Sequence, residues 1–411
     1  MGALGRLWKK ILGNVFTTLA LLLGVMQVAV GHWAVVVVAG REGPGLAVGS
    51  LLAAVLVAAN YLLMPVLRRA RRGTGWARPV ANLYMSVGVA TLLLGAAVTF
   101  SFLGWLPLGA LLSWVGVGPE TVFGLFRIAS GAIVGSIAAM LLWGFTVGQS
   151  QLDHTHLHVP LPDLADEHAG LRILQLSDLH IGNGMEGERL SRLIEHVNER
   201  EPDLIALTGD LFDFDPSFVE DGCRRLGELR ARLGVFAVLG NHDVYTGTEV
   251  VADGFARHAP SVRLLRGDVV RLETDAPLYI AGLDDPSGVW TARGLEIPEL
   301  TALAENVPTD GNTVLLVHRP ELFPQAARLG FPLVLAGHTH GGQLALPLAG
   351  GRHNMARLIT RFARGLYTEA GSLLYVNRGV GVAGPAVRVN CPREVATLEL
   401  QRASEGFGGL S

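Results

Sequence analysis

Residues 172–182 read RILQLSDLHIG, a short apolar run followed at once by polar side chains. The run is rich in Leu and Ile, which is typical of a strand buried in a parallel sheet. It ends at Asp178 and His180. Because ligands bind beyond the carboxyl ends of the strands in open α/β sheets, this strand end is a candidate functional site.

Four further apolar runs end in the same kinds of polar residue. They are DLIALTG (203–209) before Asp210 and Asp213, VFAVLG (235–240) before Asn241 and His242, TVLLVH (313–318) ending in His318, and PLVLAGHTH (332–340) ending in His338 and His340. Helix-like stretches alternate with these runs, and this alternation predicts a helix-covered α/β core. Five strand ends would therefore supply one site.

The polar side chains at these strand ends indicate a metal site. Carboxylates, imidazoles and an amide, without thiolates, are the ligands of hard and borderline divalent metals such as Mn, Fe and Zn. A catalytic zinc site uses three protein ligands, whereas a larger set suits two ions about 3.5–4 Å apart that share a carboxylate. The candidate ligands are Asp178, His180, Asp210, Asn241, His318, His338 and His340, with Asp210 as the bridge. For any single Asp, capping of a helix or turn is the alternative explanation.

The motifs at these strand ends resemble those of a known family. The motifs DLH (178–180), GDLFD (209–213), GNHD (240–243), His318 and GHTH (337–340) are similar to the motif series of the calcineurin-like metallophosphoesterases, over about residues 158–400. AGLDDP, GHTHGGQ and LYVNRGVG resemble its bacterial, membrane-associated branch. The resemblance implies a fold of two facing mixed β-sheets flanked by helices.

The resemblance also implies a role for each motif residue. It assigns Asp178, His180 and His340 to one metal, and Asn241, His318 and His338 to the other, with Asp210 bridging. His242 follows the ligand Asn241, so its side chain projects differently and stays free to protonate the leaving group. Asp213 would orient His242 and hold it protonated. These roles predict hydrolysis by a metal-activated hydroxide.

The first part of the chain has a different composition. Residues 1–150 contain ten Lys or Arg and two acidic residues, whereas the remainder contains 23 basic and 34 acidic residues. Four apolar segments, at about 12–36, 45–67, 81–105 and 128–147, are near or above the roughly 20 residues that cross a bilayer. The apolar stretch 106–117 either lengthens the third segment or lies in the membrane interface. We therefore predict a transmembrane domain at 1–150 and a catalytic domain at 151–411.

Basic residues indicate how the chain is oriented. Arg6, Lys9 and Lys10 precede the first segment, and a loop between the second and third carries Arg68, Arg69, Arg71, Arg72 and Arg78. The positive-inside rule places both regions in the cytoplasm. Four spans return the catalytic domain to the cytoplasm, so we predict an integral protein of the bacterial inner membrane. Arg127 is expected to mark the edge of the fourth segment.

The predicted function is a membrane-anchored phosphohydrolase with two divalent metal ions (Mn, Fe or Zn). Its substrate is a phosphodiester, phosphomonoester or pyrophosphate, and membrane tethering favours a lipid or lipid-linked one. The alternative is a membrane sensor or scaffold that keeps the fold without turnover. The acidic half has no basic stripe with interleaved aromatics, so nucleic acid is not an expected partner. His154, His156 and His158 alternate along one strand, which predicts an exposed face or, alternatively, a third metal site without further ligands nearby.

Overall fold

The structure is a computed structural model that describes residues 15–71, 77–286, 297–346 and 353–403. The chain forms two compact units, Met1–Phe145 and Thr146–Ser411. Arg6, Lys9, Lys10 and Arg72, and the predicted start of the first apolar segment at residue 12, lie outside the described residues.

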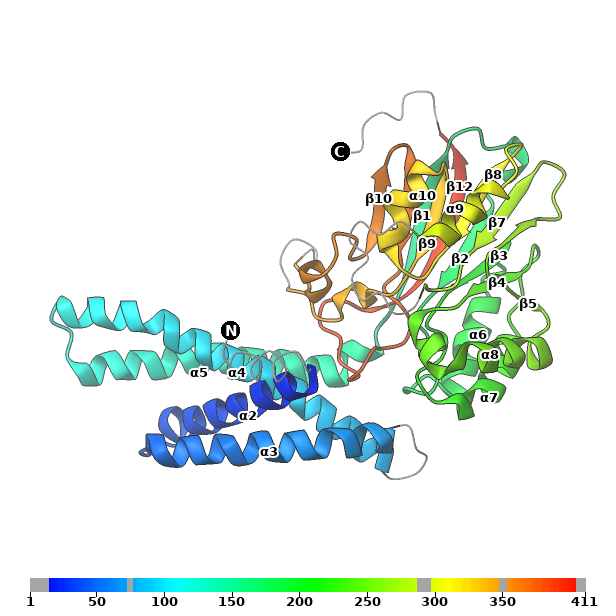
Figure 1. Cartoon of the computed structure of the whole chain (residues 1–411). Coiled ribbons are helices and arrows are strands. Elements are labelled where there is room, and N and C mark those ends of the chain that lie inside the picture. The colour runs from blue at the N-terminus through cyan, green and yellow to red at the C-terminus, as the bar shows by residue number, and fades with distance from the viewer. Residues whose placement is uncertain (1–14, 72–76, 287–296, 347–352, 404–411) are drawn as a thin grey trace, which may run out of the picture. The chain divides into compact units, whose positions relative to one another are not determined.

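The first unit consists of apolar helices, as predicted. They are α2 (Val15–Trp33), which continues as the π-helix η1 (Ala34–Val38), α3 (Leu46–Arg71), α4 (Ala77–Trp114) and α5 (Pro119–Thr146) (Figure 1). Four helical segments are long and apolar enough to cross a membrane. Residues 106–114 lengthen the third helix, and α5 begins upstream of Arg127, so this residue lies within the helix and not at its edge. Its Nε atom donates to the carbonyl of Val37 at 2.9 Å.

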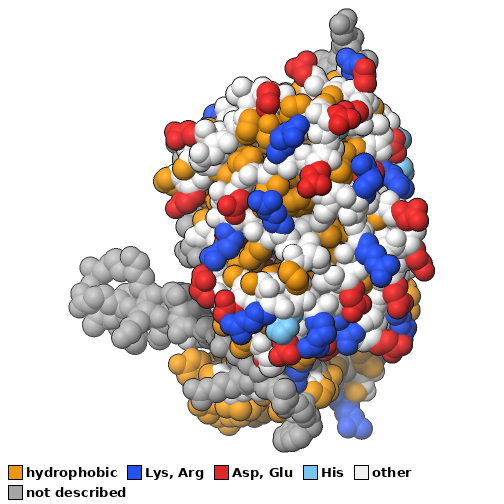
Figure 2. Space-filling model, turned by 90° about the vertical axis from the view of Figure 1, so that its right-hand side faces the viewer, with side chains coloured by type: hydrophobic (Ala, Val, Ile, Leu, Met, Phe, Trp, Pro, Cys, Tyr) orange, Lys and Arg blue, Asp and Glu red, His pale blue; other side chains and the backbone are white. Residues whose placement is uncertain are grey.

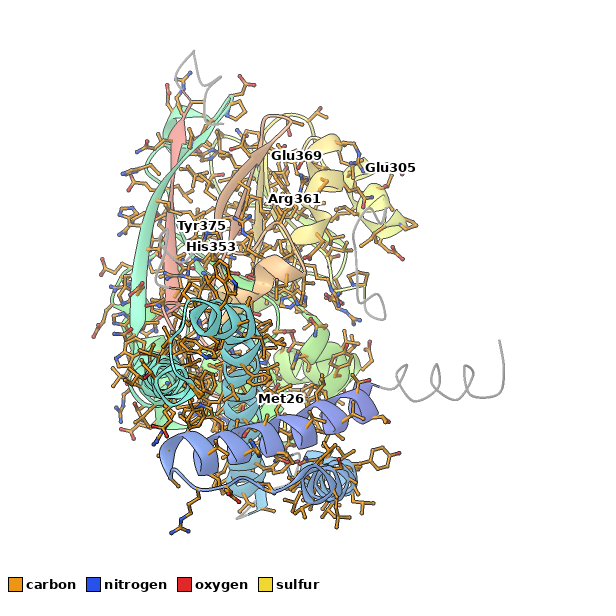
Figure 3. All side chains as sticks on the ribbon, turned by 90° about the vertical axis from the view of Figure 1, so that its left-hand side faces the viewer. Met26, Glu305, His353, Arg361, Glu369 and Tyr375 are labelled. Atoms are coloured by element: carbon orange, nitrogen blue, oxygen red, sulfur yellow. The ribbon has the colours of Figure 1, made fainter. Side chains whose placement is uncertain are left out.

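Polar contacts and close approaches join α2, α3 and α4. The Asn60 amide donates to Gln27 at 3.0 Å and accepts from the Tyr84 hydroxyl at 2.5 Å. A Cβ atom on Gly95 would lie 2.6 Å from the side chain of Met26, which is labelled in Figure 3. Small residues allow helices to approach closely, and interhelical hydrogen bonds stabilise such contacts where water is absent.

The second unit contains two mixed six-stranded sheets, which confirms the predicted fold class. The strand order of the first sheet is β1 (Leu152–Leu161), β12 (Arg393–Arg402), β2 (Arg172–Leu176), β3 (Leu204–Thr208), β4 (Val235–Val238) and β5 (Val262–Leu264). The order of the second is β10 (Gly365–Glu369), β11 (Ser372–Val376), β9 (Leu333–Ala336), β8 (Asn312–Leu316), β7 (Leu278–Gly282) and β6 (Asp268–Arg271).

The two sheets face each other between outer layers of helices. Alternate residues of a strand point to opposite faces, so Ile173 packs between the sheets and Leu174 packs outward. The helices α6 (Glu188–Asn198), α7 (Val219–Leu226) and α8 (Asn241–His258) cover the first sheet, while α9 (Pro298–Glu305) and α10 (Phe323–Arg328) cover the second. Tyr375, labelled in Figure 3, belongs to the core between the sheets, and its hydroxyl donates to Glu394 at 2.9 Å.

The face shown in Figure 2 has a mixed surface. Acidic and basic side chains are interspersed there, with hydrophobic side chains between them. Interspersed charges of both signs produce no large field of one sign over this face.

The carboxyl ends of five strands meet at one edge of the two sheets. The parallel strands β2, β3 and β4 supply this edge in the first sheet, and β8 and β9 supply it in the second. The sheets are joined there by polar contacts. The Gln175 amide donates to the carbonyl of Ala336 at 3.0 Å, and Nδ1 of His318 lies 2.9 Å from the carbonyl oxygen of Thr208.

Candidate metal centre

The loops that follow the strands hold their polar residues in an unusual backbone conformation. Five of the seven candidate ligands have positive φ angles, namely Asp178 (52°), His180 (47°), Asp210 (52°), His338 (71°) and His340 (50°). For residues other than glycine this left-handed conformation costs about 1–2 kcal/mol each. Backbone strain of this kind persists only where surrounding contacts hold it, and it concentrates at functional sites.

The contacts that hold these loops are mainly backbone hydrogen bonds. The amide of Asp178 donates to the carbonyl of Gly209 at 3.0 Å, and the amide of His180 donates to the carbonyl of Asp210 at 3.0 Å. The Asp178 carboxylate in turn accepts from the amide of His338 at 3.0 Å. The loops from the two sheets are therefore joined directly.

Glycines in two motifs allow this close approach. A Cβ atom on Gly240 would lie 2.3 Å from the backbone nitrogen and a carboxylate oxygen of Asp210. A Cβ atom on Gly337 would lie 2.3 Å from a carboxylate oxygen of Asp178. Real Cβ atoms do not approach other atoms this closely, so these two positions in GNHD and GHTH require glycine.

One group of candidate ligands comes from β2 and β9. Asp178, His180 and His340 are all buried and each offers a donor atom within 4.8 Å of the others. The Nε2 atoms of His180 and His340 are 3.0 Å apart, and Nε2 of His340 lies 3.4 Å from Oδ1 of Asp178. Two imidazole nitrogens and a carboxylate oxygen thus converge on one point.

A second group is centred on Asp210. Its Oδ2 atom lies 3.2 Å from Nε2 of His318. The same His318 nitrogen lies 3.1 Å from Nδ1 of His338. The same Oδ2 atom lies 3.6 Å from Nε2 of His180 in the first group. The Asp210 carboxylate therefore lies between the two groups.

Asn241 completes the set of candidate ligands. Its Oδ1 atom is buried and has no hydrogen-bond partner in the part of the chain that the structure describes. The next residue, His242, donates its backbone amide to Oδ1 of Asp210 at 2.7 Å, which keeps Asn241 close to the bridge. An amide oxygen without a partner and two pairs of facing imidazole nitrogens fit divalent cations, because each offers an electron pair to a shared centre.

The charges within the cluster are strongly coupled. Burial would lower the pKa of His318, but the carboxylates of Asp210, Asp178 and Asp285 together outweigh this effect and raise the pKa to about 10. Burial, together with the positive charge of His318, lowers the pKa of His338 to about 3. Burial would raise the pKa of Asp210, but His318 and His242 hold it well below its usual range. Metal binding would thus displace a proton from His318 and find His338 already neutral.

His242 and Asp213 lie next to the two groups. Oδ1 of Asp213 is 2.8 Å from Nδ1 of His242 and 3.2 Å from Nδ1 of His180. Burial would lower the pKa of His242, but Asp210 and then Asp213 outweigh it and raise it. His242 also offers a donor atom within 4.8 Å of His180 and Asp210. The structure therefore brings all nine predicted site residues together around Asp210 or one of its neighbours.

Sequence reasoning missed three features around the cluster. Asp243 accepts from the backbone amides of Gly240, Leu211 and Phe212, so it fastens the loops that carry Asp210 and Asn241. Phe214 stacks on the exposed Tyr245 at 5.7 Å and lies 4.5 Å from the His242 ring. Met355, Leu358 and Ile359, from the short 3₁₀-helix η8 (Met355–Leu358) and the residue after it, are exposed near His338 and His340. In the sequence, only the position of Asp243 in the GNHD motif indicated the first of these features.

The expectation that no further ligand lies near the strand histidines was wrong. β12 pairs with β1 and brings Glu399 next to them, with Oε2 3.1 Å from Nε2 of His156 and Oε1 3.6 Å from Nδ1 of His158. Both histidines are exposed, as predicted. The Nε2 atoms of His154 and His196 are 2.8 Å apart. Pairing between strands distant in sequence is what the sequence pattern could not reveal.

Comparisons with known proteins indicate the family of the chain. Residues 171–342 match the family model described as calcineurin-like phosphoesterase. An uncharacterized metallophosphoesterase of Aquifex aeolicus is 36% identical over 56% of this chain and 85% of its own length. An uncharacterized metallophosphoesterase of Campylobacter jejuni is 33% identical over 59% of this chain and 62% of its own length.

A relative from Danio rerio extends the similarity beyond the catalytic unit. This protein, named transmembrane protein with metallophosphoesterase domain, is 30% identical over 334 residues, which is 78% of this chain and 73% of the relative. The aligned region is longer than the second unit, so it includes part of the apolar helical unit. The chain is a membrane protein, and it belongs to the calcineurin-like metallophosphoesterase family.

Proposed function

We propose that the chain is a membrane-anchored phosphoesterase that uses two divalent metal ions. The observation that carries the proposal is the pair of buried Asp and His groups that share the Asp210 carboxylate. We assign Asp178, His180 and His340 to one ion and Asn241, His318 and His338 to the other. Two such ions would supply Lewis acidity toward the phosphoryl oxygens and an acidified water.

His242 is the proposed general acid. Its Nδ1 atom lies 2.8 Å from Asp213, so a proton on Nδ1 is held by the carboxylate. In the protonated ring the Nε2–H is then free to donate to the leaving oxygen, and the raised pKa of His242 favours that form. Asp213 acts through His242 by fixing the orientation of the ring.

The substrate is proposed to be a lipid or lipid-linked phosphoester. A pocket of about 380 Å³ is lined by His338 and His340 and also by Met355, Leu358 and Ile359. Leu358 is 74% exposed and Ile359 is 68% exposed. Exposed apolar side chains next to a polar centre suit a ligand with one apolar and one charged end.

Removal of this apolar rim is expected to affect only substrates with an alkyl chain. Leu358→Ser combined with Ile359→Ser should lower kcat/KM for a long-chain alkyl p-nitrophenyl phosphate by roughly tenfold or more, because apolar burial is lost. The rate with methyl p-nitrophenyl phosphate should not change. Equal rates of the variant and the parent protein with both substrates would exclude an acyl-chain role for this rim.

Metal dependence provides the direct test of the chemistry. The full-length protein in detergent should lose hydrolysis of bis(p-nitrophenyl) phosphate and p-nitrophenyl phosphate after chelation. Mn²⁺, Fe²⁺ or Zn²⁺ should restore it, and the ratio of the two rates would distinguish a diesterase from a monoesterase. An absence of turnover with every metal, on these and on lipid-presented phosphoesters, would favour the sensor or scaffold function.

We also propose that the protein lies in a bacterial inner membrane with its catalytic unit in the cytoplasm. The support is the basic residues that flank the first apolar segment and separate the second from the third, including Arg78. A reporter at the carboxyl terminus that is active only in the cytoplasm should give a signal. A signal from a periplasm-specific reporter at the same position would reverse the orientation.

A further inference from the structure

The catalytic unit has a further polar pocket, lined in part by β1, α6 and β12. Its volume is about 330 Å³, and none of the proposed metal ligands lines it. We call it the arginine pocket. Its polar lining consists of Ser150, His154, Arg189, Arg192, His196 and Arg393. Among its ten described lining residues, none is Asp or Glu.

Arg393, at the start of β12, is the most unusual residue of this pocket. It is only 4% exposed, and its Nε atom has no hydrogen-bond partner among the described residues. Its Nη2 atom makes only a long contact of 3.4 Å with the Gln149 side chain. Burial, followed by the charges of Arg189 and Arg388, lowers the pKa of Arg393 to about 9. A buried guanidinium surrounded by other cations is unfavourable unless an anion joins it.

Two further arginines reach the pocket from α6. Arg189 and Arg192 are three residues apart and therefore lie on the same side of the helix. Arg189 donates to the carbonyl of Gly184 at 3.1 Å. Partial burial lowers the pKa of Arg189, although the charge of Glu186 acts in the opposite direction. Arg192 pairs with Glu188 at 2.6 Å, but both side chains are largely exposed, so this pair is weak.

The histidines add to the same electrostatic pattern. Nε2 of His154 lies 2.8 Å from Nε2 of His196. Burial, followed by the charge of Arg200, lowers the pKa of both rings. The cationic form of each is therefore disfavoured in the same cavity where Arg393 is buried without a counter-charge. An anion in the cavity would stabilise all of these groups at once.

We propose that the arginine pocket binds a phosphate group, either as a free ion or as the headgroup of a membrane lipid. Guanidinium groups bind phosphate through paired N–H donors, and the pocket presents three of them together with Ser150. Both sources share this chemistry. A lipid source is consistent with the sequence, because Ser150 ends the last apolar segment that is long enough to cross a membrane.

The test uses the full-length protein in detergent after chelation, so that metal ions contribute nothing to anion binding. Titration with inorganic phosphate, followed by calorimetry and by the rise in Tm, should show binding. Arg189→Gln with Arg192→Gln should weaken it roughly tenfold or more, because charge-assisted hydrogen bonds are lost. Arg224→Gln with Arg257→Gln is the matched control, since those arginines are exposed and paired on α7 and α8.

A third variant addresses the buried arginine. Arg393→Lys keeps the charge and loses the paired donors, so it should also weaken phosphate binding while the protein remains folded. Unchanged phosphate affinity in the Arg189/Arg192 double variant would overturn the proposal. Both residues are exposed overall, with the Arg189 side chain only partly buried, so the variant is expected to fold. An absence of phosphate binding by the parent protein, in detergent and in phosphatidylcholine nanodiscs, would overturn it as well.

Nanodiscs separate the two sources of phosphate. In discs of phosphatidylcholine alone, free phosphate should bind as it does in detergent. In discs that also contain phosphatidic acid, a lipid headgroup in the pocket should suppress that binding in the parent protein and in the Arg224/Arg257 control. Equal phosphate binding in both kinds of disc would assign the pocket to the free ion.

Discussion

Replacement of His242 by alanine is expected to lower kcat by about 10²- to 10⁴-fold for a phosphoester with an alkyl leaving group. The physical reason is the loss of the proton donor that Asp213 orients at 2.8 Å. The loss should be much smaller with p-nitrophenyl substrates, because p-nitrophenolate leaves without protonation. Rates for both leaving groups, measured with the full-length protein, would show this difference.

Metal content distinguishes this role from a ligand role. His242 lies within reach of His180 and Asp210, so a loss of activity alone would not identify it as an acid. Elemental analysis of His242→Ala should give the same two ions per chain as the parent protein. The exposed His353→Ala serves as the control for both measurements. A variant that loses one equivalent of metal, with equal losses for both leaving groups, would assign His242 to the ligand set.

Asp210→Ala is expected to have the largest effect of any single substitution. In the parent protein, Oδ2 of Asp210 lies 3.6 Å from Nε2 of His180 in one group and 3.2 Å from Nε2 of His318 in the other. Both ions should therefore be lost, and turnover should fall by at least about a thousandfold, since both the activated water and the charge stabilisation depend on them. Metal analysis and kcat of the full-length protein are the measurements.

Two comparisons give this prediction its specificity. Asp178→Ala removes a carboxylate from only one group, so it should leave about one ion bound at the other. Asp221→Ala removes an exposed carboxylate that pairs with Arg225, and it should change neither metal content nor kcat. If Asp210→Ala retained a full equivalent of metal, its carboxylate would not be shared between the two groups.

Much of the centre could be predicted because its residues obey a local rule. Each candidate ligand follows a short apolar run, and a parallel strand places its carboxyl end at a predictable edge. That rule depends on neighbours in sequence, so it identified Asp178, Asp210 and His318 without knowledge of the partners of any strand. The contact between His242 and Asp213 joins two of these strand ends, and the family resemblance, not the local rule, implied it.

The features that were missed depend on contacts between distant parts of the chain. Glu399 approaches His156 only because β12 pairs with β1. The apolar rim at Leu358 comes from the four-residue 3₁₀-helix η8, which is too short to give a periodic pattern, so nothing in the sequence indicated a surface role. The burial of Arg393 beside other cations is likewise a tertiary property that composition does not reveal.

The left-handed backbone at five candidate ligands has a consequence for protein engineering. Glycine adopts this conformation without the cost that Asp and His bear there. Laboratory evolution that selects for heat resistance alone, in metal-free medium, would therefore reward glycine at the proposed metal ligands. Clones selected in this way would lose the proposed metal ligands, so such a campaign should select for turnover and thermal stability together.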